Sequence, residues 1–225
     1  MKKITILGSC RQDSLYKKYN ITSIKNDISY PHYTKEMLEV IKFCKFGNIS
    51  PNDTLKIFRT PALTKNPIYF SNSLKDEFES SDIYILEIAS RLSYKINDKY
   101  VHHIYYDDNN YNKETKNLIN VDNLTDNEIE DDIIEIKKLI NKPIIIVSHL
   151  VTYNKGSRYE LAELLKNICI KYNILFINPI QEIIKRGYNL NELFLRENKL
   201  AHYNDKGHDI ILSIYDDFIS QIGTS

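Results

Sequence analysis

Four short β-branched runs constrain the fold of this chain most, because each lacks helical period and ends at polar or turn residues. Runs of this kind are typical of parallel strands that are buried on both faces of a sheet. Since both faces of such a sheet need a cover, the pattern predicts helices on each side of it. The predicted strands are Ile4–Leu7, Ile83–Ile88, Pro143–Val147 and Ile174–Ile177.

Amphipathic stretches between these runs predict the covering helices. The stretch 159–172, which lies between the last two predicted strands, places Leu161, Leu165 and Ile168 at helical spacing. Further helices are predicted over 34–43, 127–140 and 205–222. We therefore expect a three-layer α/β sandwich with a mostly parallel central sheet, and we expect residues 1–225 to form one domain.

Two segments interrupt this alternation and are expected as insertions, at about 29–72 and 94–123. Prolines break up the first segment, which we expect to cap or line the site. The second is rich in Tyr, Asn and Asp, and we expect a long solvated excursion there. It contains His102 and His103, predicted on a solvated surface, and the stretch 107–112, predicted to be a solvated loop in preference to a metal site.

Charge and cysteine usage exclude several classes of partner and cofactor. Thirty basic residues offset thirty acidic ones, so no net field attracts the chain to nucleic acid or to an anionic membrane. No stretch approaches the roughly 20 apolar residues of a membrane span. The three cysteines, Cys10, Cys44 and Cys169, form no CxxC pair for zinc or disulfide exchange. With no signal-peptide pattern at the N-terminus, these features predict a cytoplasmic protein without a metal.

The first candidate site follows the first predicted strand, because open parallel sheets bind ligands beyond the carboxyl ends of their strands. Gly8-Ser9-Cys10-Arg11 stands there. At such a strand-to-helix turn, a small nucleophile can be exposed while backbone N–H groups bind one oxyanion. The alternative is structural: Gly8 makes a tight turn, Ser9 caps the next helix and Cys10 is buried.

A second segment, His202-Tyr-Asn-x-x-Gly207, stands just before the last predicted helix. Together with the Gly-Ser-Cys opening, it resembles the SGNH/GDSL hydrolase superfamily. The resemblance implies a flavodoxin-like sheet with a nucleophile after its first strand and a catalytic histidine, here His202, before its last helix. Asp205-x-x-His208 matches the family's Asp-x-x-His literally, but His208 follows Gly207 and is expected on the helix instead.

The chain departs from the family pattern at several positions. Cys10 takes the place of the family's serine and Ser9 that of its aspartate, and either residue remains a candidate nucleophile. Lys199 replaces the aspartate that precedes the catalytic histidine, and no glycine over 28–32 matches the second motif. Arg91 stands at the position of the oxyanion-hole asparagine.

A thiol nucleophile explains the missing aspartate. A cysteine has an ordinary pKa of about 8.5 and can ionise beside a histidine at a helix N-terminus, so a Cys10–His202 dyad is chemically sufficient. Arg91 would then donate to the oxyanion or hold an anionic substrate. Its structural alternative is an ion pair with Glu87 or another acid.

Openings of the Gly-Ser-Cys type are similar to divergent branches of the superfamily that are linked to polysaccharide biosynthesis, including one implicated in acetyl transfer with coenzyme A. The resemblance therefore implies acetyl-CoA as co-substrate and a sugar amine or hydroxyl, on a small molecule or a nucleotide-linked sugar, as acceptor. It also implies fusion to, or association with, another sugar-processing domain. Two alternatives stay open: a carbohydrate or lipid esterase or deacetylase, and a sugar-binding module that has lost its chemistry.

Basic residues beside the site are the candidate contacts for the coenzyme. Arg11 follows the nucleophile turn. A polar loop after His149 places Lys155, Ser157 and Arg158 just ahead of a predicted helix, where charged, hydroxyl and backbone N–H groups can bind phosphate. A plain loop in which Ser157 caps the helix is the alternative.

Overall fold

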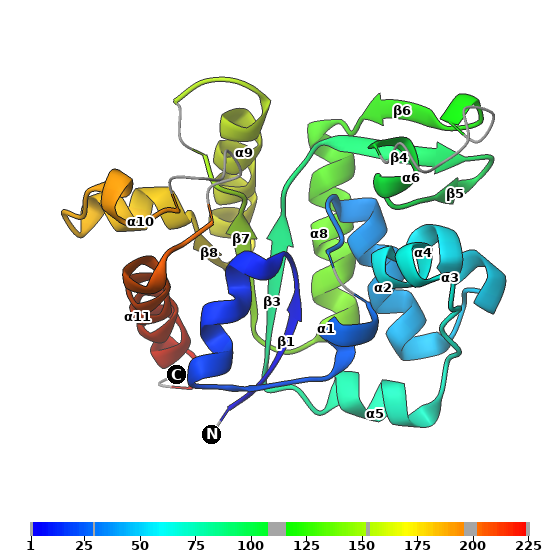
Figure 1. Cartoon of the computed structure of the whole chain (residues 1–225), viewed down its shortest axis with the longest axis horizontal. Helices are drawn as coiled ribbons and strands as arrows, with labels where there is room; N and C mark the ends of the chain where they lie inside the picture. The colour runs from blue at the N-terminus through cyan, green and yellow to red at the C-terminus, as the bar shows by residue number, and fades with distance from the viewer. Residues whose placement is uncertain (1, 29, 108–115, 152–153, 196–201, 224–225) are drawn as a thin grey trace.

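The computed structural model describes residues 2–28, 30–107, 116–151, 154–195 and 202–223 (Figure 1). Its main sheet has five parallel strands in the order β2-β1-β3-β7-β8. Renumbered along the chain within this sheet, the order becomes 2-1-3-4-5, which is the doubly wound order of flavodoxin-like folds. The predicted fold class is confirmed, and the two-residue β2 is an addition to it. The strands are β1 (Lys3–Leu7), β2 (Asn20–Ile21), β3 (Ile83–Ile88), β7 (Ile144–Ser148) and β8 (Leu175–Ile177).

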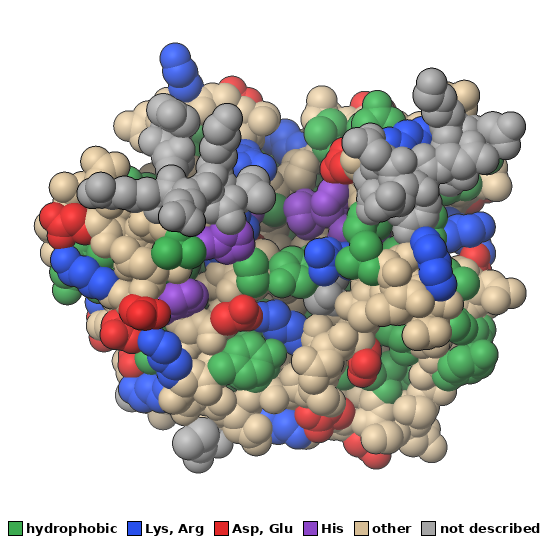
Figure 2. Space-filling view, in the orientation of Figure 1, with side chains coloured by type: hydrophobic (Ala, Val, Ile, Leu, Met, Phe, Trp, Pro, Cys, Tyr) green, Lys and Arg blue, Asp and Glu red, His purple; other side chains and the backbone are tan. Residues whose placement is uncertain are grey.

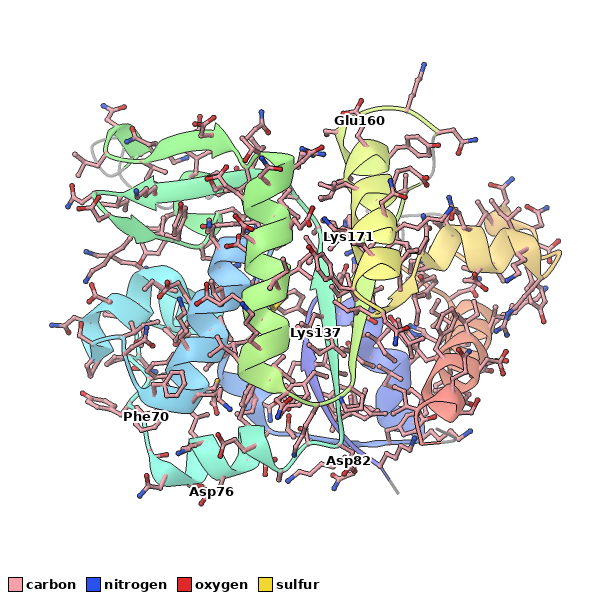
Figure 3. The ribbon with its side chains drawn as sticks, turned by 180° about the vertical axis from the view of Figure 1, so that it is seen from behind. Phe70, Asp76, Asp82, Lys137, Glu160 and Lys171 are labelled. Carbon is pink, nitrogen blue, oxygen red and sulfur yellow. The ribbon has the colours of Figure 1, made fainter. Side chains whose placement is uncertain are left out.

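Helices cover both faces of this sheet. Alternate residues of β3 point to opposite faces of the sheet. Leu86 and Ile88 belong to the apolar core on one face, and Ile85 belongs to the core on the other. Figure 3 shows α8 and α9 side by side on the back of the molecule, where Lys171 of α9 pairs with Glu130 of α8 at 2.6 Å. The first core lies against α2 (Thr34–Phe46), α8 (Asp126–Ile140) and α9 (Ser157–Lys171), and the second against η1 (Cys10–Lys17), α10 (Pro179–Lys185) and α11 (Asp205–Gln221).

The segment 29–72 is helical where its prolines allow it. Pro51 stands in the first turn of α3, where its missing N–H is not needed, and Ser50 caps the same helix by accepting the N–H of Asp53. Among the described residues, no helix is long and apolar enough to cross a membrane. The helices within this segment are α2, α3 (Pro51–Ile57) and α4 (Arg59–Thr64), and it is flanked by α1 (Ile24–Asp27) and α5 (Asn72–Glu79).

The prediction of a solvated excursion over 94–123 holds for the exposed residues 120–123 and is wrong for the described residues that pack on the core. The segment takes part in a second, antiparallel sheet of order β5-β4-β6. Aromatic side chains explain the difference, because Tyr94 and Tyr105 are buried in the first apolar core. Of the Asn/Asp-rich stretch, residues 108–112 lie outside the described part of the chain. The elements are β4 (Leu92–Ile96), β5 (Lys99–Tyr100), α6 (Ile104–Asp107) and β6 (Asn120–Asn123).

The prediction of a solvated surface for His102 and His103 is also wrong. His102 is fully buried, and its Nε2 donates to the backbone oxygen of Tyr30 at 3.0 Å while its Nδ1 accepts the N–H of Ile104 at 3.1 Å. The two imidazole rings lie 4.2 Å apart between their centroids. They lie together because this segment is a turn ahead of α6 and not a strand, so adjacent side chains do not point to opposite faces.

Candidate active site

The turn between β1 and η1 carries the predicted nucleophiles at the carboxyl edge of the main sheet. A Cβ on Gly8 would lie 2.8 Å from the Cβ of Glu87, and only glycine avoids this contact. The buried Ser9 hydroxyl donates to Glu87 Oε2 at 2.6 Å and accepts the Arg11 N–H at 3.4 Å, and thereby caps η1. Cys10, which begins η1, is partly exposed. The turn therefore holds Ser9 inside the fold and presents Cys10 to the surface.

The Cys10 sulfur and Nδ1 of His202 lie 3.7 Å apart, although 192 positions separate the two residues in the chain. Two motif residues shape the approach of His202 to the sulfur. Asn204 caps α11 by accepting the Gly207 N–H at 2.9 Å, and a Cβ on Gly207 would lie 2.3 Å from the backbone oxygen of Leu193, so only glycine fits. The His-Tyr-Asn-x-x-Gly segment thus brings an imidazole within reach of a thiol, as a nucleophile and its base require.

The other histidine of the C-terminal segment has a different partner. His208 lies on α11, and its Nδ1 is 2.7 Å from the hydroxyl of Ser14 on η1. This contact joins two helices on the same face of the sheet. Lys199, which stands at the family's aspartate, lies outside the described residues.

Glu87 is the centre of a buried hydrogen-bond network beneath the nucleophile turn. Its Oε2 accepts the Ser9 N–H at 2.8 Å, the Ser9 hydroxyl, and the Gln12 amide at 3.1 Å, and its Oε1 accepts Nδ1–H of His149 at 2.9 Å. Burial would raise the pKa of Glu87, but the hydrogen bonds and charge of His149, with those from Ser9, lower this pKa to about 2. The carboxylate is therefore ionised at neutral pH. Sequence reasoning considered it only as a partner of Arg91, although a lone acid inside an apolar strand was a signal.

His149 follows β7 and is oriented by Glu87. Its side chain is 11% exposed. Burial lowers the pKa of His149, and the charges of Arg11 and Arg158 act in the same direction, against the raising effect of Glu87. Because the ionised carboxylate accepts a hydrogen bond from Nδ1–H, we assign the proton of the neutral ring to Nδ1. The Nε2 atom then carries a free lone pair. A carboxylate–imidazole pair of this kind can act as a base, so His149 is a second candidate beside His202.

Tyr30 is a site residue that the sequence analysis did not find. Its φ of +64° is uncommon outside glycine, and its ring lies under the guanidinium of Arg59 at 4.5 Å from the centroid. His102 binds its backbone oxygen, as described above. Burial, followed by the charge of Cys10 and a side-chain hydrogen bond with it, raises the pKa of Tyr30 to about 12. The phenol is therefore protonated at neutral pH, and it lies near the thiol.

A cavity of about 520 Å³ opens at the carboxyl end of the sheet, between β4 and the start of α9. Figure 2 shows histidine side chains in the hollow of this face, with basic side chains beside it. Burial, followed by the charge of His103, lowers the pKa of His32 to about 3, so its imidazole is uncharged at neutral pH. Lining side chains of this cavity include His32, Arg91, Tyr94, His103, Asp107 and Arg158.

The structure separates the remaining predicted site residues. Arg91 lines the cavity but pairs with Asp126 at 2.5 Å, so its structural alternative is present with an acid other than Glu87. Ser157 and Arg158 line the cavity, whereas Lys155 is exposed and is not among its lining residues. The capping role for Ser157 is wrong, because α9 begins at Ser157 after Gly156 and has no side-chain cap. Arg11 lies beside the turn, with its NH1 3.3 Å from the Ser9 hydroxyl.

The fold is doubly wound α/β, and a cysteine faces a histidine at the carboxyl edge of its sheet. These two features are typical of candidate nucleophilic enzymes on flavodoxin-like scaffolds. No family model matches this chain, and no curated protein matches it. Among solved structures, it is similar to a catalytic mutant of Axe2, an acetylxylan esterase from Geobacillus stearothermophilus. The two chains are 14% identical, with a TM-score of 0.42 over 100% of this chain and 95% of the other. This level of likeness transfers neither a residue role nor a substrate.

Proposed function

We propose that this protein is an enzyme of acyl transfer in which Cys10 is the nucleophile and His202 its base, and that it hydrolyses carboxylic esters. The observation that carries the proposal is the 3.7 Å approach of the Cys10 sulfur to Nδ1 of His202. Hydrolysis is the simplest reaction for this site, because water is the only acyl acceptor that it needs. A carbohydrate or lipid ester is the expected substrate class.

The reaction has two halves. In the first, the thiol proton moves to His202, the thiolate attacks the ester carbonyl, and the alcohol leaves with the proton from His202. In the second, water attacks the thioester and gives its proton to His202, the C–S bond breaks, and the released acid leaves the thiolate ready for another cycle. The protonated Tyr30 hydroxyl, which lies near Cys10, supplies a donor to the oxyanion that forms in both halves.

Acetyl transfer from acetyl-CoA to a sugar amine or hydroxyl is the second candidate. It uses the same thioester and replaces water by the acceptor. The observation in its favour is that Ser157 and Arg158 line the cavity, with Arg11 beside the nucleophile turn. The exposed position of Lys155 weakens this candidate, since one of the four expected coenzyme contacts lies away from the cavity.

The deciding experiment compares two acyl donors. Wild type, Cys10→Ala and Cys10→Ser are incubated with 4-nitrophenyl acetate, and the acylated cysteine is sought by mass spectrometry of quenched protein. The same proteins receive acetyl-CoA with and without a panel of amino sugars, and free thiol is measured. Ester turnover without acceptor supports the hydrolase, and acceptor-dependent thiol release supports the transferase. If neither donor labels Cys10 or turns over, the enzyme proposal is overturned in favour of a binding module.

A further inference from the structure

We propose that the cavity beside the nucleophile turn binds an anionic group of the substrate, a carboxylate or a phosphate, between Arg158 and Arg91. This inference rests on the proposed function, because it names the substrate class of the same site. It draws on contacts that are independent of the Cys10–His202 pair.

Two connections place the cavity next to Cys10. The first runs along the chain, since Tyr30 lies close enough to Cys10 for that residue's charge to raise its pKa, and His32, two residues later, lines the cavity. The backbone oxygen of His32 accepts the N–H groups of Ala89 and Ser90 at 2.9 and 3.0 Å, which fixes this segment to the end of β3. The second connection runs through Glu87, which hydrogen-bonds both Ser9 and His149.

One carboxylate links the nucleophile turn to the cavity wall. Glu87 holds Ser9 with Oε2 and His149 with Oε1, so the turn and the His149 ring lie on either side of one side chain. The charge of Arg158 in turn lowers the pKa of His149. A substrate whose acyl group reaches Cys10 can therefore extend past His149 to Arg158.

Two buried polar atoms without partners lie on the walls of this cavity. Arg91 Nε and His103 Nδ1 are buried side-chain atoms with no hydrogen-bond partner among the described residues. Buried polar atoms of folded proteins are rarely left unpaired, so these two indicate a polar ligand. Both belong to residues that line the cavity.

Arg158 provides the charge. Its side chain is exposed at the start of α9, where it lines the cavity, and within the described ranges no ion pair joins its guanidinium to a carboxylate. Partial desolvation, followed by the charge of Arg11, lowers the pKa of Arg158. An anion in the cavity would give this guanidinium a bidentate, charge-assisted partner.

Three acidic side chains bear on that attraction. The ionised Glu87 acts on Arg158 through its charge, but its oxygens are already bonded to Ser9, Gln12 and His149. Asp107 lines the cavity, but its side chain is 57% exposed and its Oδ2 lies 3.9 Å from Nε2 of His103. Asp126 forms an ion pair with NH1 of Arg91, while Nε of the same guanidinium has no hydrogen-bond partner among the described residues. Of the two arginines, Arg158 is therefore the principal anchor and Arg91 the secondary one.

The test uses two esters of the same shape, 4-acetoxybenzoate and the uncharged 4-acetoxybenzamide. The measured quantity is the ratio of kcat/KM for the charged ester to kcat/KM for the neutral one. We expect wild type to prefer the charged ester by about ten- to a hundredfold, the range of one charge-assisted contact. Arg158→Gln should bring this ratio close to one. Arg186→Gln, which removes a partly exposed arginine paired with Asp217, is the matched control and should keep the wild-type ratio.

A preference that is absent in wild type, or unchanged in Arg158→Gln, overturns the anion site while leaving the hydrolase proposal intact. If wild type cleaves neither ester, the proposed function fails, and binding of 4-hydroxybenzoate and of coenzyme A by calorimetry decides the anion site alone. If Arg158→Gln no longer binds coenzyme A, the result supports a site for phosphate. If it no longer binds 4-hydroxybenzoate, the result supports a site for carboxylate. No binding of either probe to wild type overturns it.

Discussion

The hydroxyl of Ser9 donates a 2.6 Å hydrogen bond to Oε2 of Glu87, an oxygen that also accepts the Ser9 backbone N–H at 2.8 Å. This contact turns the Ser9 side chain towards a buried carboxylate beneath the sheet edge. The next residue, Cys10, is the one that meets His202. The relationship favours Cys10 over Ser9 as the nucleophile, a choice that the sequence motif left open.

Cys10→Ala and His202→Ala should each remove turnover of 4-nitrophenyl acetate. Loss of a general base typically costs about 10²–10⁴ in rate, and loss of the nucleophile costs at least as much. The double variant should be no slower than the slower single one, because the two side chains act as a unit. His208→Ala, whose ring contacts Ser14, is the control and should retain most of the activity. An active Cys10→Ala together with an inactive Ser9→Ala would move the nucleophile by one residue.

Tyr30→Phe should slow both alkylation of Cys10 by iodoacetamide at neutral pH and ester turnover. The change removes only the hydroxyl that lies near Cys10, and loss of one oxyanion donor typically costs about 10²–10³ in kcat. The exposed Tyr69 offers a matched control, Tyr69→Phe, with no expected effect. Normal alkylation and normal kcat in Tyr30→Phe would reduce the phenol to a packing role.

Glu87→Gln should make the stability of the protein less dependent on pH in the acid range. The pKa of Glu87 is about 2 in the folded protein and near 4.3 in an unfolded chain, so the folded state binds this proton more weakly. The ionised side chain then contributes roughly 3 kcal/mol above pH ~4.3, and this contribution is lost as the pH falls towards 2. Urea unfolding of wild type and variant at pH 6 and pH 3 measures the difference. Equal loss of stability in both proteins would show that another group carries it.

His32→Gln should reduce acid destabilisation at higher pH than Glu87→Gln does. The pKa of His32 is about 3 in the folded state and near 6.5 when unfolded, so the unfolded chain takes up the proton first. Stability therefore falls as the pH drops from about 6.5 to 3, by up to several kcal/mol for this one ring. The urea midpoint of wild type should decline more steeply than that of His32→Gln between pH 7 and 4. Parallel curves for the two proteins would contradict this assignment.

Local pattern was enough to predict the framework of this protein. A run such as Ile83–Ile88 is apolar at nearly every position, and that pattern fits a strand buried on both faces whatever its neighbours are. The same holds for the helix that begins at Asp205, whose apolar residues recur with the helical period. Because turns at the carboxyl ends of parallel strands meet at one edge, the sequence also pointed to Cys10 as a site residue, and the resemblance of the His-Tyr-Asn-x-x-Gly segment added His202.

Tertiary structure alone decided which side chains complete that site. The contacts of Glu87 with Ser9 and His149 join residues 78 and 62 positions apart, and no local pattern encodes them. Tyr30 was missed and His102 was predicted on a solvated surface for the same reason, since a solvated loop and a buried one differ in what packs over them and not in their own residues. Sequence periodicity thus determined the strands, the helices and the edge where chemistry can occur. The protonation states and partners at that edge follow from burial and long-range packing, which exist only in the folded chain.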